Sequence, residues 1–306
     1  MDKSTKIWYN GRIIDWDNAT VHILTHALHY GTAVFEGLRC YKTDRGRAVF
    51  RIYDHVWRLI NSAKIYLMDL GYRADEVAEA IKTTVIANGL QECYIRPIAF
   101  YGFGEMGVNP LNNKVDFGIA AWRWDSYLGK DALTNGVRCM VSSWRRINPL
   151  TLPPQAKSSA NYANASLAKI ESLKAGYDEA IMLNTQGMVS EGTGENIFRV
   201  KRGVISTPNA AAGILRGITR DTVIQLASEL QLSCHRIDIS REELYTADEL
   251  FLCGTAAEIT PVREVDGRPI GDGEYPVTRK LQQAYDDVVH GRNKKHEDWL
   301  TYLRST

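Results

Sequence analysis

Residues 188–198 read MVSEGTGENIF, in which the polar segment SEGTGEN is flanked by apolar residues. Two other stretches have the same character, QAKSSANYANAS at 155–166 and FLCGTAAEITP at 251–261. Alone, each has an ordinary interpretation, because exposed lysines, glycine turns and strand ends are common in globular proteins. Together they place a lysine, carboxylates and hydroxyls on polar connections between apolar segments.

The segments around these three stretches alternate between strand and helix patterns. Strands are predicted from buried apolar runs, at residues 137–144, 179–184, 195–200 and 249–254. Helices are predicted from amphipathic runs, at residues 161–173, 219–230 and 277–289. The second half of the chain is therefore predicted to mix helices and strands in one domain.

The first third also mixes strands and helices. IWYNGRIIDW at 7–16 predicts a hairpin, because Asn10-Gly11 suits the left-handed positions of a tight turn. A helix is expected from Asp54, as its cap, to about Leu70, and another from about residue 74 to the stop signal at residues 88–89. CYIRPIAFYG and VDFGIAAWRW are apolar enough to be buried strands.

The apolar pattern lapses around residues 122–136, where we expect the connection between two domains. This divides the chain into a small N-terminal domain of residues 1–123, an interdomain loop of residues 124–134 and a larger domain of residues 135–306. The predicted fold class is α+β, with two domains and a cleft between them.

Composition excludes several classes of protein. The chain has 306 residues, 44% of them hydrophobic and 24% charged, and a net charge of +1, so no overall field favours nucleic acid or an anionic membrane. No apolar run reaches the roughly 18 residues that a membrane helix needs, and no signal peptide is visible. The five cysteines contain no C-x-x-C pair, which argues against a zinc ribbon or a disulfide framework. We expect a cytoplasmic protein.

Two motifs suggest other functions and are set aside. GFGEMG at 102–107 matches a dinucleotide-binding pattern, but the following VNPLNN opposes the helix that such a site requires. His22, His26 and His29 could share a helix face, yet no cysteine or carboxylate cluster completes a metal site. We expect structural histidines and no metal.

The three polar stretches supply what an aldehyde cofactor with a phosphate requires. Lys157 can form a Schiff base and move a proton if its surroundings lower its pKa. A carboxylate must hold a proton on a pyridine nitrogen, and a hydroxyl should steady the phenolic oxygen. The phosphate needs backbone N–H groups at a helix start, and LRGITRDTVIQL at 215–226 offers one.

The chain resembles the branched-chain aminotransferases of the class IV, fold-type IV, pyridoxal-phosphate family over nearly its whole length. The resemblance rests on seven ordered motifs, namely HALHYGTAVFEGLR, YIRPIAFYG, MGVNP, AKSSANY, SEGTGENIF, GITRD and ADELFLCGTAAEITPV. It implies a small α/β N-terminal domain, a larger C-terminal pseudo-barrel domain and a homodimer or higher homo-oligomer. It also implies a transferase of branched-chain amino-acid biosynthesis, which passes the amino group of leucine, isoleucine or valine to 2-oxoglutarate in a ping-pong cycle.

The resemblance, and not the spacing, assigns roles to residues. Lys157 is the implied catalytic residue, which carries pyridoxal 5'-phosphate. The other implied cofactor residues are Arg58, Gly217, Ile218, Thr219, Gly254 and Thr255 around the phosphate, Tyr162 at the phenolic oxygen, and Glu191 (rather than Glu195) at the pyridine nitrogen. The implied substrate residues are Phe35, Gly37, Tyr94, Arg96, Trp124, Tyr127, Thr255 and Ala256, with Tyr30, Met106 and Val108 from the neighbouring subunit. Arg96 is the expected partner of the second carboxylate of glutamate, with an ordinary ion pair as its alternative.

The chain departs from the family pattern at two places. Arg216 stands where the family often has proline, and Ser158, Ser159 and Ala160 stand where glycines are common after the lysine. Neither departure removes a reacting group. A D-amino-acid transaminase or an aminodeoxychorismate lyase shares the cofactor residues and remains an alternative, as does a non-catalytic ligand-binding protein of the same fold.

Overall fold

The computed structural model describes residues 3–124, 128–129 and 131–303. The chain divides into two compact units. Unit 1 contains residues 1–124, 156–160 and 287–306, and unit 2 contains residues 125–155 and 161–286. The sequence-based division assigned 156–160 and 287–306 to the second domain, whereas the structure groups them with the first. Tertiary pairing decides this, because the last strand, β17 (Leu300–Tyr302), pairs with a strand of unit 1.

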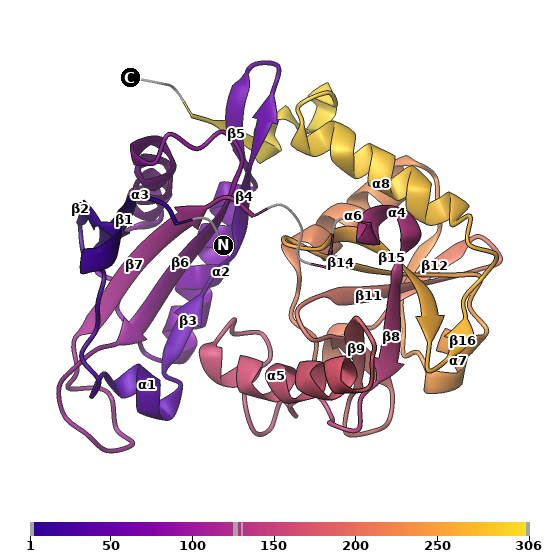
Figure 1. The fold of residues 1–306 in the computed structure, drawn as a ribbon, viewed down its shortest axis with the longest axis horizontal. Helices are drawn as coiled ribbons and strands as arrows, with labels where there is room; N and C mark the ends of the chain where they lie inside the picture. Colours follow the sequence, from indigo (N-terminus) through magenta and orange to yellow (C-terminus); the bar gives the residue numbers. More distant parts are fainter. Residues whose placement is uncertain (1–2, 125–127, 130, 304–306) are drawn as a thin grey trace. The chain divides into compact units, whose positions relative to one another are not determined.

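Within its described residues, unit 1 carries an eight-stranded sheet in the order β17-β5-β4-β6-β7-β1-β2, with β3 beside β6 (Figure 1). Its other strands are β1 (Lys6–Tyr9), β2 (Arg12–Asp15), β3 (Ala33–Phe35), β4 (Leu38–Thr43), β5 (Gly46–Phe50), β6 (Cys93–Tyr101) and β7 (Val115–Trp122). Its helices are η1 (Trp16–Asn18), α1 (His26–Tyr30), α2 (Ile52–Ile65), α3 (Ala74–Ala87) and η3 (Lys294–Trp299).

Helices α2 and α3 cover one face of the sheet in unit 1. Val56 and Leu59 of α2 and Ile81 of α3 belong to one buried cluster with Ile95 and Phe117 of the strands. Burying such side chains contributes about 1.5–3 kcal/mol each, so this packing is the main support of the unit.

Unit 2 contains a nine-stranded sheet, counted over its described residues, in the order β10-β9-β8-β15-β14-β11-β12-β13, with β16 beside β15. Its strands are β8 (Val137–Val141), β9 (Glu179–Leu183), β10 (Val189–Gly192), β11 (Asn196–Lys201), β12 (Val204–Thr207), β13 (Cys234–Arg236), β14 (Glu249–Gly254), β15 (Glu258–Val265) and β16 (Arg268–Pro269). The helices are α4 (Ala132–Asn135), α5 (Ser159–Lys174), η2 (Ala210–Ala212), α6 (Ile218–Glu229), α7 (Arg241–Tyr245) and α8 (Pro276–Val289), of which α5 begins and α8 ends in unit 1.

The short turn from β10 to β11 brings an edge strand of this sheet back toward its middle. Gly192 N donates to Glu195 O at 2.7 Å, and β11 then pairs with β14 near the centre of the order. The sheet therefore curls into a half-barrel, as the resemblance implied.

Most of the predicted elements are confirmed, with one clear exception. The hairpin forms as expected, with φ of 47° at Asn10 and 91° at Gly11. Helix α2, however, begins after Arg51 and ends at Ile65 rather than near Leu70. Asp54 does not cap it, because it lies inside the first turn of the helix, where its carboxylate accepts a hydrogen bond from Arg51 Nε at 2.8 Å.

The end of α2 is set by a turn that the sequence did not reveal. Leu67 has a φ of 54°, in the left-handed region that usually favours glycine. Met68 N donates to Ala63 O at 2.9 Å, and Leu67 N donates to Lys64 O at 3.1 Å. These two bonds satisfy the last carbonyls of the helix, so the helix ends about a turn earlier than its apolar pattern suggests.

No helix in the described part of the chain is long and apolar enough to cross a membrane.

Candidate active site

An interruption in the sheet of unit 1 organises the candidate substrate residues. Strands β3 and β4 pair with β6 in one register, with Phe35 opposite Ile98 and Leu38 opposite Ile95. Between them the ladder breaks opposite Pro97, which has no N–H to donate and whose carbonyl accepts from Glu36 N at 2.9 Å. Because side chains alternate along a strand, Phe35 and Gly37 lie on one face and Glu36 on the other.

The first face brings together five residues that the resemblance assigns to the substrate. The guanidinium carbon of Arg96 lies 4.7 Å from the ring centroid of Phe35, and Arg96 Nη2 donates to Tyr94 Oη at 3.0 Å. The ring of Trp124 meets Tyr94 edge-on with centroids 4.7 Å apart. A Cβ on Gly37 would lie 2.0 Å from Tyr94 Oη, so this approach requires glycine.

Arg96 retains an unused donor on this face. Its Nε is buried and has no hydrogen-bond partner among the described residues. A buried N–H without a partner costs about 1–3 kcal/mol, so its presence indicates a group that a ligand can satisfy.

Lys157 is anchored to the same part of unit 1. Its carbonyl accepts from Phe35 N at 2.9 Å, and its N–H donates to Ser62 Oγ of α2 at 3.0 Å. Lys157 Nζ lies 5.1 Å from the ring centroid of Phe35. The backbone of the lysine is thus fixed between β3 and α2.

The departures from the family pattern after the lysine fit this packing. Ser158 is buried, and its Oγ accepts from Tyr66 Oη at 3.0 Å. Ala160 lies against Gly31, where a Cβ would come within 3.2 Å of the alanine Cβ. Arg216, the other departure, is exposed in unit 2.

Arg58, which the resemblance assigns to the phosphate, is bonded to a buried carboxylate. Arg58 Nε and Nη2 donate to Glu36 Oε1 and Oε2 at 2.5 and 2.8 Å. His55 Nδ1 lies 2.7 Å from Glu36 Oε2. Burial raises the pKa of Glu36, but the charge of Arg58 and the bonds from Arg58 and His55 outweigh it and hold that pKa well below the usual value.

Glu36 and His55 were not among the predicted site residues. Glu36 lies in the FEGLR motif, within the mostly apolar run AVFEGL at 33–38. A charged residue in such a run was the available signal, since buried carboxylates need partners.

In unit 2, Glu191 lies in a shell of donors on β10. Its Oε2 accepts from Asn196 Nδ2 and from Leu215 N, each at 3.0 Å. Its Oε1 forms an ion pair with Arg146 Nε at 2.9 Å. The sequence missed Arg146 and Asn196, because neither has a distinctive spacing from Glu191.

The start of α6 adjoins this shell. Its N-cap residue, Gly217, has no side chain to cap the first turn, and Ile218 and Thr219 are buried there. A Cβ on Gly217 would lie 2.1 Å from Asn196 Oδ1, so only glycine allows this approach. The amide groups and dipole of a helix start favour an anion.

Glu195, the alternative to Glu191, has a different environment. Its Oε2 accepts from Gly194 N at 3.1 Å, and its buried Oε1 has no partner among the described residues. Burial, followed by repulsion from Glu179, raises the pKa of Glu195 to about 8. Glu179 keeps its own cation, Lys169 Nζ at 2.7 Å.

The remaining predicted residues lie in both units. Tyr162 is half-buried on α5, and Gly254, Thr255 and Ala256 lie at the end of β14 and in the turn that follows, all in unit 2. Tyr30, Met106 and Val108 are exposed in unit 1, with 41%, 46% and 82% of their surface accessible. Tyr127 lies outside the described residues.

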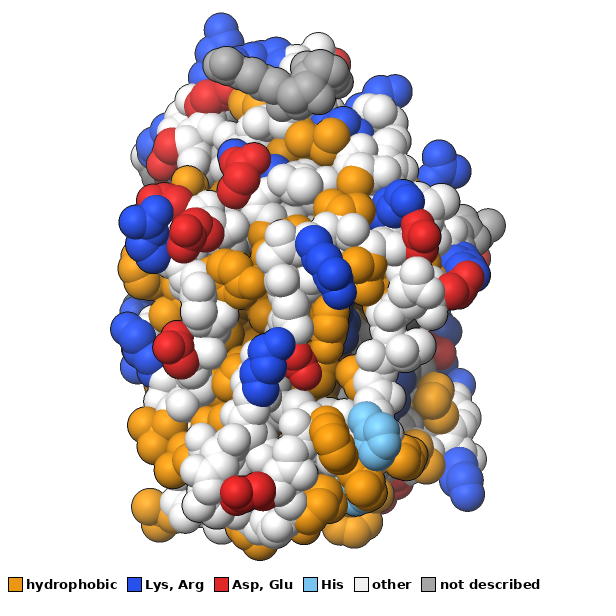
Figure 2. Space-filling view, turned by 90° about the vertical axis from the view of Figure 1, so that its left-hand side faces the viewer, with side chains coloured by type: hydrophobic (Ala, Val, Ile, Leu, Met, Phe, Trp, Pro, Cys, Tyr) orange, Lys and Arg blue, Asp and Glu red, His pale blue; other side chains and the backbone are white. Residues whose placement is uncertain are grey.

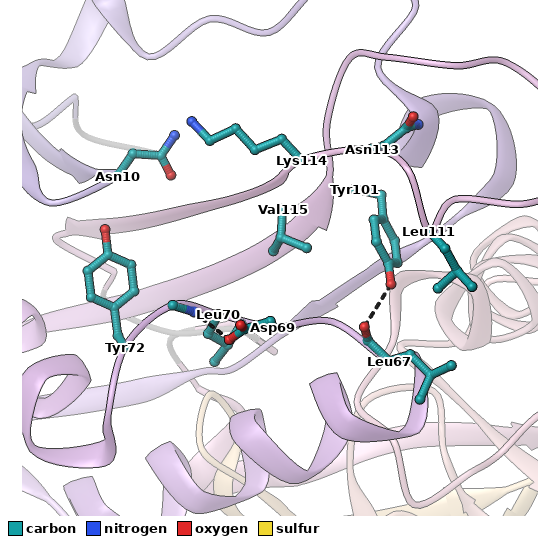
Figure 3. Close-up of a pocket in the computed structure, with 11 residues that line it drawn as sticks. Asn10, Leu67, Asp69, Leu70, Tyr72, Tyr101, Leu111, Asn113, Lys114 and Val115 are labelled. Carbon is teal, nitrogen blue, oxygen red and sulfur yellow. Dashed lines mark hydrogen bonds between the residues drawn. The ribbon is translucent and has the colours of Figure 1, made fainter.

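A pocket of about 510 Å³ in unit 1 is separate from these groups (Figure 3). Its wall includes Tyr101, whose Oη donates to the carbonyl of Leu67 at 3.0 Å, and Asp69, whose Oδ1 accepts from Gly71 N at 2.9 Å. None of the described residues that line it is assigned to the cofactor or the substrate.

His26 and the segment after the glycine-rich motif decide between the structural and the ligand-binding interpretations. His26 is buried, with Nδ1 2.8 Å from Thr32 Oγ1 and Nε2 2.7 Å from Gly107 O. No group of three or more potential metal ligands occurs among the described residues. Residues 103–114, all of them described, contain no helix after GFGEMG, so the context of a dinucleotide site is missing there.

Comparison with known proteins supports a single family. Residues 33–265 match the family described as amino-transferase class IV. The chain is 47% identical over 304 residues to a branched-chain-amino-acid aminotransferase of Pseudomonas aeruginosa, with 99% of each chain covered.

Solved structures give the same result for the fold. The crystal structure of Escherichia coli branched-chain amino acid aminotransferase has a TM-score of 0.97 and 46% identity, covering 99% of this chain and 100% of that one. A branched-chain amino acid aminotransferase solved in complex with N-(5'-phosphopyridoxyl)-L-glutamate has a TM-score of 0.95 and 45% identity, with the same coverage. The branched-chain aminotransferase of Thermoproteus uzoniensis with norvaline has a TM-score of 0.94 and 44% identity, again with 99% and 100% covered.

Proposed function

Because the chain belongs to the amino-transferase class IV family, we propose that it is a pyridoxal-phosphate enzyme that transaminates branched-chain amino acids. The observation that carries this proposal is the group in unit 1 formed by Lys157, Phe35, Gly37, Tyr94 and Arg96. It sets an amine beside an aromatic surface that suits an aliphatic side chain, with an arginine whose Nε is buried. The similarity to branched-chain aminotransferases along almost the whole chain supports the same substrate class.

The described residues fit the cofactor. Gly217 lets the start of α6 approach Asn196 closely, and the backbone amide groups of that helix start suit a phosphate. Glu191 accepts from Asn196 and Leu215 and pairs with Arg146, so it is held in place to meet a protonated ring nitrogen. The related aminotransferase solved in complex with a phosphopyridoxyl compound supports this assignment.

The chain's residues then divide the work of the reaction. Pyridoxal 5'-phosphate, when bound, would supply an electron sink for the loss of the α-proton. Lys157 holds the cofactor and moves the proton at the α-carbon. Tyr162 steadies the phenolic oxygen, and Glu191 holds the proton on the ring nitrogen. Arg58, Gly217, Ile218, Thr219, Gly254 and Thr255 hold the phosphate.

Arg96 explains how one pocket accepts both leucine and glutamate. Phe35 and Trp124 suit an aliphatic side chain, whose burial contributes about 1.5–3 kcal/mol. A carboxylate in that setting needs a cation, and the unused Nε of Arg96 offers a charged donor. The second substrate is therefore proposed to be 2-oxoglutarate, in a ping-pong cycle. Tyr127 and Ala256 complete the proposed pocket.

An apolar surface in unit 1 supports a homodimer. Ile23, Leu28, Phe103 and Val108 have 74%, 60%, 57% and 82% of their surface exposed. Figure 2 shows hydrophobic side chains gathered toward the lower edge of this side, where Figure 1 draws α1. Such an exposed apolar surface is typical of an interface. A second copy would cover it and would receive Tyr30, Met106 and Val108 in its pocket.

The cytoplasm is the proposed compartment. Cys40 and Cys93 lie directly opposite each other on β4 and β6, and both are free thiols. Such a pair fits a reducing compartment. The comparisons do not favour the D-amino-acid transaminase or lyase alternatives, because the relatives named above are branched-chain enzymes.

One spectroscopic experiment tests the proposed function. Adding L-leucine to the purified enzyme with its cofactor should remove the visible absorption band, and 2-oxoglutarate should restore it. D-Leucine should have no effect, and Lys157→Ala should abolish both changes. A response to D-amino acids alone would contradict the proposal, and a fully active monomer in sedimentation would contradict the dimer.

A further inference from the structure

We propose that Glu36 and His55 are positioning residues that fix the guanidinium of Arg58 for the cofactor's phosphate. The inference rests on the proposed function, which assigns Arg58 to that phosphate. We call Glu36, His55 and Arg58 the Glu36 cluster.

The backbone conformation directs the side chain of Glu36 toward α2. Pro97 interrupts the ladder at residues 36–37, and the carbonyl of Pro97 holds Glu36 N at 2.9 Å. The side chain of Glu36 points to the helix-covered face of the sheet, where none of its surface is exposed. His55 and Arg58 are three residues apart on α2, so they share a helix face and reach the same carboxylate.

The contacts leave little freedom to the guanidinium. Arg58 Nε and Nη2 meet the two oxygens of Glu36 at 2.5 and 2.8 Å, which fixes the plane of the arginine. A guanidinium held in this way by one carboxylate can also donate to a second anion, since it has five N–H groups. His55 Nδ1 at 2.7 Å and Gly37 N at 3.2 Å both hold Glu36 Oε2.

The surroundings of His55 favour the neutral imidazole, which acts as a hydrogen-bond donor. Burial lowers the pKa of His55, and the charges of Arg58 and Lys157 act in the same direction against the opposing effect of Glu36. A neutral imidazole can donate from Nδ1 to the carboxylate without adding a second cation. Arg58 therefore remains the cation of the cluster.

The cluster adjoins the lysine that carries the cofactor. Ser62 Oγ donates to Arg58 O at 2.8 Å and accepts from Lys157 N at 3.0 Å. Arg58 and Lys157 thus share one anchor on α2. A buried ion pair generally adds little stability over apolar side chains of the same size. The ion pair of Glu36 and Arg58 beside Lys157 therefore indicates that the orientation of Arg58 matters.

The test compares two cofactors that differ only in the phosphate. Apoprotein of full-length wild type, Glu36→Gln, Arg58→Met and the double variant is titrated with pyridoxal 5'-phosphate and with pyridoxal. The ratio of the two dissociation constants measures the contribution of the phosphate to binding, because both aldehydes react with Lys157. Glu195→Gln, the same change at a buried glutamate of unit 2, is the matched control.

Glu36→Gln should reduce the preference for the phosphorylated cofactor by ten- to hundredfold, the loss expected for charge-assisted bonds. Its affinity for pyridoxal should stay near that of wild type, and the control should keep the wild-type ratio. The double variant should lose no more than Arg58→Met, because Glu36 acts through Arg58.

Other outcomes overturn the inference. An unchanged or increased ratio in Glu36→Gln, with a loss in Arg58→Met, would mean that Glu36 does not position Arg58, while the proposed function would stand. An unchanged ratio in Arg58→Met would remove both the inference and the phosphate role of Arg58. If Glu36→Gln does not fold, His55→Phe, which keeps the ion pair, must show the same selective loss, and a wild-type ratio would refute the proposal.

Discussion

Glu36 in unit 1 and Glu195 in unit 2 are both buried glutamates, with 0% and 4% of their surface exposed, yet they hold opposite charge states. Glu36 accepts from Arg58 and His55, and its pKa is held well below the usual value. Glu195 accepts from Gly194 N and faces the carboxylate of Glu179, and its pKa is raised to about 8. The surroundings therefore favour the ionised form of Glu36 and the protonated form of Glu195.

The difference teaches that burial alone does not decide the charge of a carboxyl group. Desolvation acts on both residues in the same direction, toward the neutral form. The donors within reach then decide which form persists. Glu191, four residues before Glu195, resembles Glu36, because Arg146, Asn196 and the backbone of Leu215 surround it.

The largest expected effect concerns catalysis and separates Glu191 from Glu195. Glu191→Gln removes the charge that holds the ring-nitrogen proton, so turnover should fall by orders of magnitude while the cofactor still binds. Glu195→Gln replaces a mostly neutral acid by a neutral amide and should leave turnover within a few-fold of wild type. Steady-state kinetics with L-leucine measure both, and the reverse order would transfer the role to Glu195.

The second effect concerns stability and separates Glu36 from Glu195. Glu36→Gln leaves Arg58 without its carboxylate in a largely buried position, which should cost about 3–5 kcal/mol in the free energy of unfolding. Glu195→Gln at pH 7 should cost much less, because the carboxyl there has no cation to lose. Urea unfolding of the apoproteins measures the difference. Equal losses would mean that the two environments are not distinct.

The third effect extends the comparison to the arginines of unit 1. Arg58 is committed to a carboxylate, whereas Arg96 has an unused Nε. Arg96→Met should weaken the half-reactions with glutamate and 2-oxoglutarate by about ten- to hundredfold, the equivalent of roughly 1.5–3 kcal/mol. The half-reactions with leucine should change much less. Single-turnover absorbance measures each half-reaction, and equal losses would assign Arg96 to general support of the pocket.

The smallest effect is the pH dependence of stability that Glu195 causes. Its pKa is higher in the folded protein than in the unfolded chain, so its contribution is fully present below about pH 4.5 and is lost as the pH rises through about 8. Between pH 6.5 and 8 this amounts to at most about 1.4 kcal/mol per pH unit. His55, with its lowered pKa, acts below pH 6.5 and in the opposite direction.

Glu195→Gln should therefore flatten the decline in the free energy of unfolding from pH 6.5 to 8. Thermal or urea unfolding at several pH values measures the slope in each protein. Parallel curves for the variant and wild type would show that Glu195 is already ionised in this range.

Local sequence predicted the elements whose signals are local. The turn at Asn10-Gly11 formed where two residues accept positive φ, and α3 ended at Asn88 as its stop signal indicated. The end of α2 was predicted too far along the chain, because Leu67 takes a left-handed conformation that is unusual for leucine. The role of the last residues was also missed, because β17 pairs with β5 across about 250 positions.

The site residues also divide into those that a local motif identifies and those that only the fold brings together. The residues assigned by motif resemblance include Lys157, the proposed Schiff-base lysine, and most of the proposed substrate face, because such groups must have particular side chains at particular places in a motif. Arg146 could not be predicted, since it lies far from Glu191 in the sequence. Asn196 lies in the same SEGTGEN segment as Glu191, but the segment alone does not show that their side chains meet. Glu36 lay within a recognised motif, but its partner Arg58 lies 22 residues away on α2.

The sequence by itself determined the family, a part of the strands and helices, and the chemical groups available, because these depend on side-chain identity and local spacing. Only the tertiary structure decided which carboxylates are ionised and which donors remain unused. Those properties depend on desolvation and on charges brought together from distant positions, and neither can be read from residue type. Glu191 and Glu195 are identical in the sequence and differ only in what the fold places beside them.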